Sequence, residues 1–83
     1  MKTLVAEKLE LKTAVDEFAR EMIARAYEKA ENGYRGWDDD AVYSTHTLLN
    51  ELTDDAYKLQ NGKLKEIDIA IRAMFLWYRR QPK

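Results

Sequence analysis

Three carboxylates near the middle of the chain have a spacing that suits a divalent cation. Glu51, Asp54 and Asp55 stand at positions i, i+3 and i+4, so in a helix they project from neighbouring turns. Carboxylates at these spacings repel one another unless a cation or a basic group on a facing helix compensates, and Mg²⁺ prefers such oxygen ligands. Two interpretations stay open: these residues belong to a metal site, or they form a solvated acidic face.

Asp68 is a carboxylate inside the most apolar stretch of the sequence, residues 67–78. An unpaired carboxylate among apolar side chains either costs several kcal/mol or takes up a proton, so Asp68 requires a partner. The local candidate is Arg72, four residues later in the favourable acid-then-base order. The alternative is that Asp68 approaches Glu51 and Asp55 and completes a Mg²⁺ site between two helices.

Aromatic and basic side chains lie together in the segment between the first two helical stretches. Trp37 is expected to pack over helix ends, as large aromatic residues generally do. Tyr34 and Arg35 can instead stack on a base or ribose, so this segment is a candidate contact for a nucleotide or a partner. The three aspartates at 38–40 precede the next helix, where acidic side chains cap backbone amides and complement the helix dipole.

Three stretches with helical periodicity must position these residues. The first covers residues 3–31, either as one long helix or as a frayed segment before a helix that begins near Thr13. The second begins near residue 42 or 45 and ends at residue 60, where Asn61 and Gly62 form a helix stop. The third covers residues 64–80 and is apolar nearly all round.

These stretches predict one all-α domain, residues 1–83, in which three principal helices form a bundle. A chain of this length buries about 60–65% of its unfolded surface and is marginally stable alone. We therefore expect a homodimer or a higher oligomer that covers the apolar third helix. The apolar run of residues 67–78 is too short to span a bilayer, which needs about 20 residues, so no membrane is expected as a partner.

Composition excludes several classes of function. The chain has 14 basic and 15 acidic residues and a net charge of −1, so binding to nucleic acid is not expected. It has no cysteine, so thiolate metal sites are excluded, and this composition is compatible with the cytoplasm. His46 is its single histidine. The opening residues MKTLVAEKLELK lack a continuous apolar core, so a signal peptide is not expected there.

The segments KAENGYRGWDD, LLNELTDDAYKL and NGKLKEIDIAIRAMFLWYRR together resemble small MazG-like proteins of bacteriophages and prophages, over about residues 14–80. The resemblance implies an all-α nucleoside triphosphate pyrophosphohydrolase that works as a dimer or larger assembly. In that family an ExxE motif and an ExxD motif on successive helices hold magnesium against the triphosphate. Glu51 and Asp54 stand at the first motif, and Asp68 stands at the end of the second.

The sequence departs from the family at Lys65, which stands where the third carboxylate is expected. Glu66 is adjacent but is turned by about 100° around the helix. A lysine there attracts phosphate and repels a cation, which favours binding without efficient turnover. The resemblance therefore points first to a non-catalytic accessory protein that binds a host protein or a nucleotide in the host cytoplasm.

Two alternatives stay open. One is an active magnesium-dependent pyrophosphohydrolase that uses Glu51, Asp54, Asp55 and Asp68. The other is an acidic mimic of DNA that presents the aspartates at 38–40, 54 and 55 to a host defence factor. The near-zero net charge disfavours the mimic.

Overall fold

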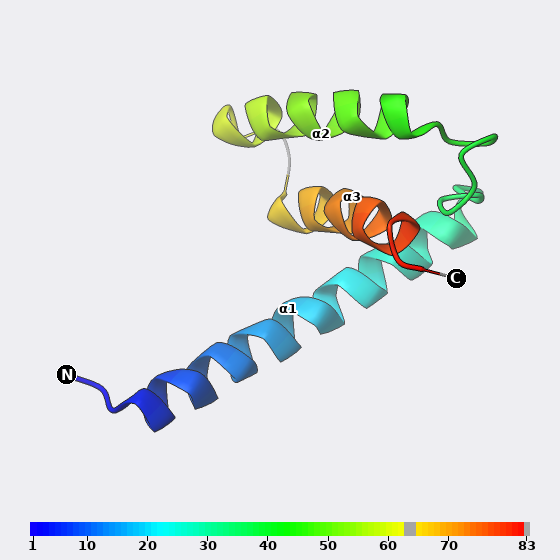
Figure 1. The fold of residues 1–83 in the computed structure, drawn as a ribbon. Coiled ribbons are helices and arrows are strands. Elements are labelled where there is room, and N and C mark those ends of the chain that lie inside the picture. Colours follow the sequence, from blue (N-terminus) through cyan, green and yellow to red (C-terminus); the bar gives the residue numbers. More distant parts are fainter. Residues whose placement is uncertain (63–64, 83) are drawn as a thin grey trace.

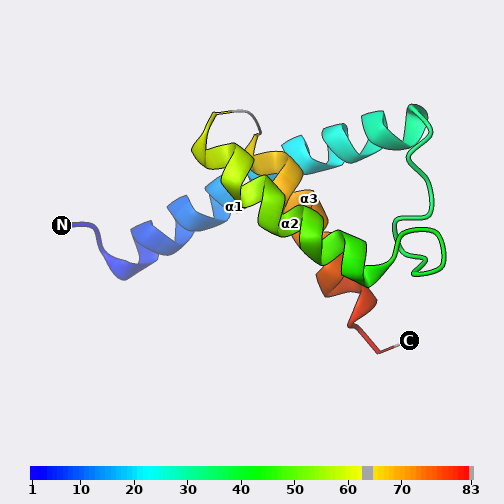
Figure 2. The ribbon, with the colours of Figure 1, turned by 90° about the horizontal axis from the view of Figure 1, so that it is seen from above.

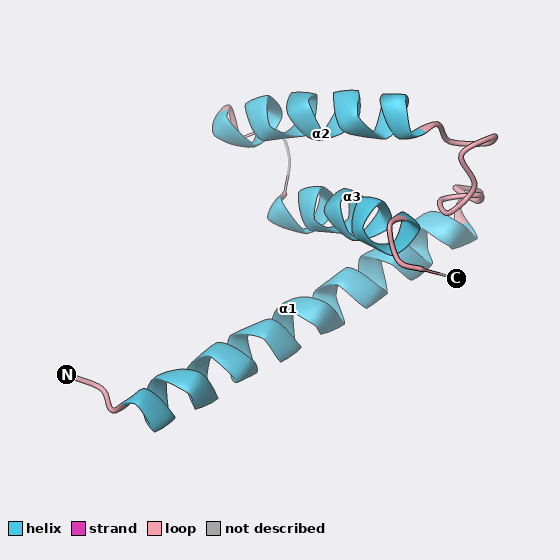
Figure 3. Ribbon diagram, viewed as in Figure 1, coloured by secondary structure: helices cyan, strands magenta, loops and turns pink. Residues whose placement is uncertain are grey.

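The computed structural model describes residues 1–62 and 65–82. Three helices follow one another along the chain: α1 (Leu4–Glu31), α2 (Thr45–Gln60) and α3 (Glu66–Arg79). Figure 3 shows that the described residues are helices joined by loops. The predicted all-α fold with three principal helices is therefore confirmed. The predicted first residue of the third helix, Leu64, lies outside the described residues.

α1 is one continuous helix, which decides between the two expected starting points. Thr3 is its N-cap, and the Thr3 side chain accepts a hydrogen bond from the Ala6 amide. Thr13 lies inside the helix, where its hydroxyl donates to the Leu9 carbonyl, so it is not a cap. With 28 residues, the helix is about 42 Å long.

The stop signals at the ends of α1 and α2 work as predicted. After α1, Gly33 takes a φ of +94°, its amide donates to the Ala30 carbonyl, and the Tyr34 amide donates to the Lys29 carbonyl. These two bonds form a Schellman motif, which needs a residue that tolerates positive φ. Gly62 closes α2 with a φ of +71°.

The start of α2 confirms that one of the three neighbouring aspartates caps backbone amides. Asp40 Oδ1 accepts hydrogen bonds from both the amide and the hydroxyl of Thr45, each at 2.7 Å. The N-cap position itself belongs to Ser44, whose hydroxyl oxygen accepts from the Thr47 amide. The helix begins at Thr45, the later of the two expected residues.

α3 lies between α1 and α2, as the two views in Figure 1 and Figure 2 show. It packs against both neighbours, whereas α1 and α2 do not pack against each other along the described residues. The small core centres on Leu48 of α2 and Ile71 of α3, which are fully buried. The N-terminal half of α1 projects away from the other two helices (Figure 1). No helix among the described residues is long and apolar enough to cross a membrane.

The segment between α1 and α2 is fastened to the C-terminal half of α3. The Trp37 ring stacks on Phe75 with 5.1 Å between ring centroids and lies 4.9 Å from the ring of Tyr78. Arg79 donates two hydrogen bonds to the Trp37 carbonyl, at 3.1 and 2.6 Å. The expectation that Trp37 packs over helix ends is confirmed, because its ring covers the end of α3.

Candidate functional site

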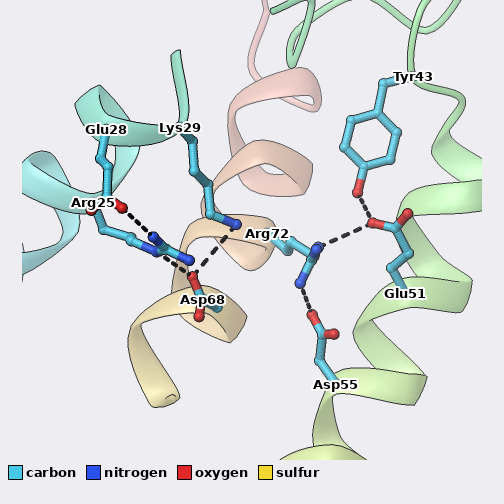
Figure 4. Close-up of polar contacts among 8 residues, drawn as sticks. All are labelled: Arg25, Glu28, Lys29, Tyr43, Glu51, Asp55, Asp68 and Arg72. Carbon is cyan, nitrogen blue, oxygen red and sulfur yellow. Dashed lines mark hydrogen bonds and ion pairs between the residues drawn. The ribbon is translucent and has the colours of Figure 1, made fainter. Parts of the chain in front are cut away.

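Glu51 and Asp55 of α2 meet at one basic side chain of α3. Arg72 Nε donates to Glu51 Oε2 at 3.1 Å, and Arg72 Nη1 forms an ion pair with Asp55. The Tyr43 hydroxyl donates to the same oxygen of Glu51. Asp55 is 3% exposed, so its charge is compensated inside the protein by Arg72 (Figure 4).

Asp68 is directed to the opposite side of α3, toward α1 (Figure 4). Its Oδ1 atom lies 3.0 Å from Arg25 Nε and 3.5 Å from Lys29 Nζ. Arg25 also pairs with Glu28 of its own helix at 2.9 Å. The expected local pair with Arg72 is therefore wrong: Asp68 pairs with two cations of α1, and Arg72 pairs with two carboxylates of α2.

The charges around Asp68 decide its protonation. Burial alone would raise the pKa of this carboxyl, but the hydrogen bond from Arg25 and the positive charges of Lys29 and Arg25 outweigh burial, and the pKa of Asp68 is lowered. On the other side of α3, burial would lower the pKa of Arg72, but hydrogen bonding with Tyr43 and the charge of Asp55 raise it. Asp68 and Arg72 are thus both ionised near neutral pH.

The residues predicted to bind magnesium are divided between two places. Glu51 and Asp55 lie together at Arg72, and Asp68 lies apart from them at Arg25 and Lys29. Asp54 is exposed on α2. Within residues 1–62 and 65–82, no three carboxylate or histidine side chains converge in a way that suits a metal ion. The Mg²⁺ site stays a prediction, and in this arrangement an ion would compete with the chain's own basic groups.

Asp68 and Lys65 share a shallow groove between α1 and α3, with a volume of about 700 Å³. α1 contributes Glu21, Arg25 and Glu28 to this groove. Lys65 is exposed at the N-cap of α3 and makes no side-chain capping bond. The groove therefore combines basic side chains that suit a phosphate with carboxylates that repel one.

The aromatic segment supplies one free ring and two anchored residues. Tyr34 is 73% exposed, so it can meet a ligand or partner. Arg35 Nε donates to the Ala30 carbonyl at the end of α1, and the Trp37 ring is already stacked on Phe75. His46 is exposed near the start of α2.

Three groups that complete the two clusters were not identified from the sequence: the cations Arg25 and Lys29 at Asp68, and the Tyr43 hydroxyl at Glu51. A signal for the first pair was present. Arg25 and Lys29 follow Phe18 and Met22 at helical spacing, so they continue an apolar stripe with two positive charges. Basic side chains on an apolar face predict an acidic partner on the helix that packs there.

Comparison of the chain with protein-family models, with curated proteins and with solved structures gives no significant match.

Proposed function

We propose that this protein is a non-catalytic helical module that acts by binding another protein. One observation supports the proposal most directly: the buried carboxylates predicted to hold magnesium are engaged by Arg72, Arg25 and Lys29 of the same chain. A metal ion that displaced these groups would leave the half-buried side chains of Arg72 and Lys29 without their acidic partners, which is unfavourable. The carboxylates are used to join the helices.

The exposed side chains are of the kind that protein interfaces use. Trp77 is 61% exposed on α3, and Tyr57 and Tyr34 are exposed on α2 and on the loop after α1. Tryptophan and tyrosine are enriched among the residues that dominate binding energy at interfaces. The resemblance to phage-borne proteins suggests that the partner is a protein of the host cytoplasm. Asp55 is buried against Arg72, which disfavours a DNA mimic that needs this aspartate at the surface.

A nucleotide is the second candidate ligand, and the groove between α1 and α3 favours it. Arg25 and Lys65 line the groove together with Asp68, so a phosphate group and a magnesium ion would both find a matching charge. On this alternative the protein is a magnesium-dependent pyrophosphohydrolase, or a relative of one that retains binding.

Incubation with Mg²⁺ and a panel of nucleoside triphosphates separates the two candidates. We expect no pyrophosphate above background and no saturable nucleotide binding by calorimetry, because the carboxylates already have cationic partners. Lys65→Glu is the matched gain-of-ligand variant, since it restores the third of the four carboxylates of the family pattern. On our proposal Lys65→Glu changes neither pyrophosphate release nor nucleotide binding. It alters the free energy of unfolding only as a surface charge does, by about 0–1 kcal/mol.

The opposite outcome is equally well defined. The unmodified protein would then release pyrophosphate, Glu51→Ala would abolish the release, and Asp38→Ala would retain it. This result would show that the chain is a pyrophosphohydrolase. Circular dichroism of each variant shows whether the helices are retained, so lost activity can be separated from lost folding.

A further inference from the structure

An apolar stripe on α1 continues well beyond the part that α3 covers. Leu4, Leu11, Val15, Phe18 and Met22 lie on one side of the helix, because they repeat at intervals of three, four or seven residues. From Met22 onward the stripe is half-buried against α3. From residue 11 to residue 20 every position is exposed. The same face is therefore an interface at one end and uncovered at the other.

The molecule has a large surface for its mass, and the N-terminal half of α1 projects away from the other helices (Figure 1). The solvent-accessible area is 6791 Å², whereas a compact monomer of 9.8 kDa exposes about 5,200 Å². The radius of gyration is 15.2 Å, against about 12 Å for a compact domain of this length. Two chains together carry an excess of roughly 3,200 Å², which is an upper bound on what pairing can cover, and obligate homodimers bury about 2,000–5,000 Å² in total.

We propose that a second copy of this chain covers residues 4–18 of α1 with its own residues 4–18. The stripe already packs against apolar residues of this same chain in its C-terminal part, so the second copy extends an interface that exists within each protomer. Residues 4–18 correspond to about 22 Å of helix without tertiary support, and isolated helices of 12–15 residues are marginal in water. Pairing supplies the packing that this segment lacks.

The charges beside the stripe permit two copies to approach. Glu7 and Glu21 lie on one flank and Lys8 and Lys12 on the other. The basic flank is partly neutralised, since Lys12 pairs with Asp16 at 2.6 Å. The net charge of −1 adds little repulsion between copies. Among the described residues, the fully buried apolar side chains are Leu48 and Ile71. Because this core is small, apolar contact with a second copy would add substantially to the stability of each chain.

Sedimentation equilibrium of the full chain at micromolar concentrations tests the proposal. We expect twice the 9.8 kDa chain mass for the unmodified protein. Leu11→Glu places a charge in the centre of the stripe and should return the mass to one chain. Leu9→Glu is the matched control, because Leu9 is 62% exposed against 60% for Leu11 but lies on a different side of the helix; this variant should remain a dimer.

Three outcomes would overturn the proposal: a monomeric unmodified protein, a dimeric Leu11→Glu variant, or equal loss of the dimer in Leu9→Glu. A second measurement covers the case in which Leu11→Glu loses helix. The chain has no cysteine, so Leu11→Cys and Leu9→Cys each carry one thiol, and the thiol at position 11 should react with a maleimide more slowly. Equal rates would contradict a covered stripe. The dimer does not depend on the function proposed above, since neither readout uses a nucleotide or a host protein.

Discussion

Arg25 of α1 and Asp68 of α3 are 43 residues apart in sequence, and their Nε and Oδ1 atoms are 3.0 Å apart. This ion pair joins α1 to α3 as the pair between Arg72 and Asp55 joins α3 to α2. α3 therefore presents an acid to one neighbour and a base to the other. Because few apolar side chains among residues 1–62 and 65–82 are fully buried, these polar contacts fix which sides of the helices meet.

Replacing Asp68 with asparagine should weaken the attachment of α1. The substitution removes the negative charge that Arg25 and Lys29 share, and hydrogen bonds to charged groups contribute about 1.5–3 kcal/mol. We expect the free energy of unfolding in urea to fall by that amount. Glu28→Gln is the control, because its exposed pair with Arg25 is worth about 0–1 kcal/mol. Equal effects of the two substitutions would contradict the role assigned to Asp68.

Replacing Arg72 with methionine should be the most destabilising change at the interface of α2 and α3. It leaves Asp55 buried without its cation, and breaking a buried pair in this way costs about 3–5 kcal/mol. Adding Asp55→Leu to the same chain should restore part of the loss, since no unpaired charge then remains. Thermal unfolding of both variants checks the prediction, and a double variant less stable than Arg72→Met would contradict it.

The contribution of Asp68 to stability should disappear in acid. Its pKa is lowered in the folded protein, so the unfolded chain binds the proton more readily. The contribution is therefore complete above the ordinary aspartate value of about 3.9 and is lost as the pH falls through the lowered folded value. The measurement is the difference in unfolding free energy between the unmodified protein and Asp68→Asn. A difference that stays constant to low pH would refute this assignment.

Gly36→Ala should cost more stability than Gly33→Ala. Both glycines have positive φ, +80° and +94°, which by itself costs an alanine about 1–2 kcal/mol. At Gly36 the added Cβ would also lie 2.6 Å from Val42 Cγ1, whereas at Gly33 it meets nothing within 4 Å. The difference between the two variants in chemical denaturation reports this clash. Val42→Ala should reduce the cost at Gly36, and equal costs at both glycines would show that the clash is relieved elsewhere.

The sequence by itself determined the helices and most of their ends. Apolar periodicity located all three helices, and Gly33 and Gly62 marked the ends of α1 and α2, because backbone conformation at a helix end depends on the residues within one turn. Capping of α2 by Asp40 was predictable for the same reason. Each of these features is decided over fewer than about ten residues, a distance at which sequence neighbours are also spatial neighbours.

Tertiary structure alone decided which charges meet and which part of the α1 stripe is covered. The sequence showed that Asp68 needs a cation and offered Arg72 at i+4, but Asp68 pairs with Arg25 once α1 packs on α3. Likewise, the stripe extends from Leu4 to Met22, with charged residues at positions 7 and 8 between Leu4 and Leu11. Only the position of α3 shows that coverage begins near Met22. The physical reason is that a helix fixes the direction of every side chain along its own axis, whereas the neighbour each one meets depends on how whole helices cross.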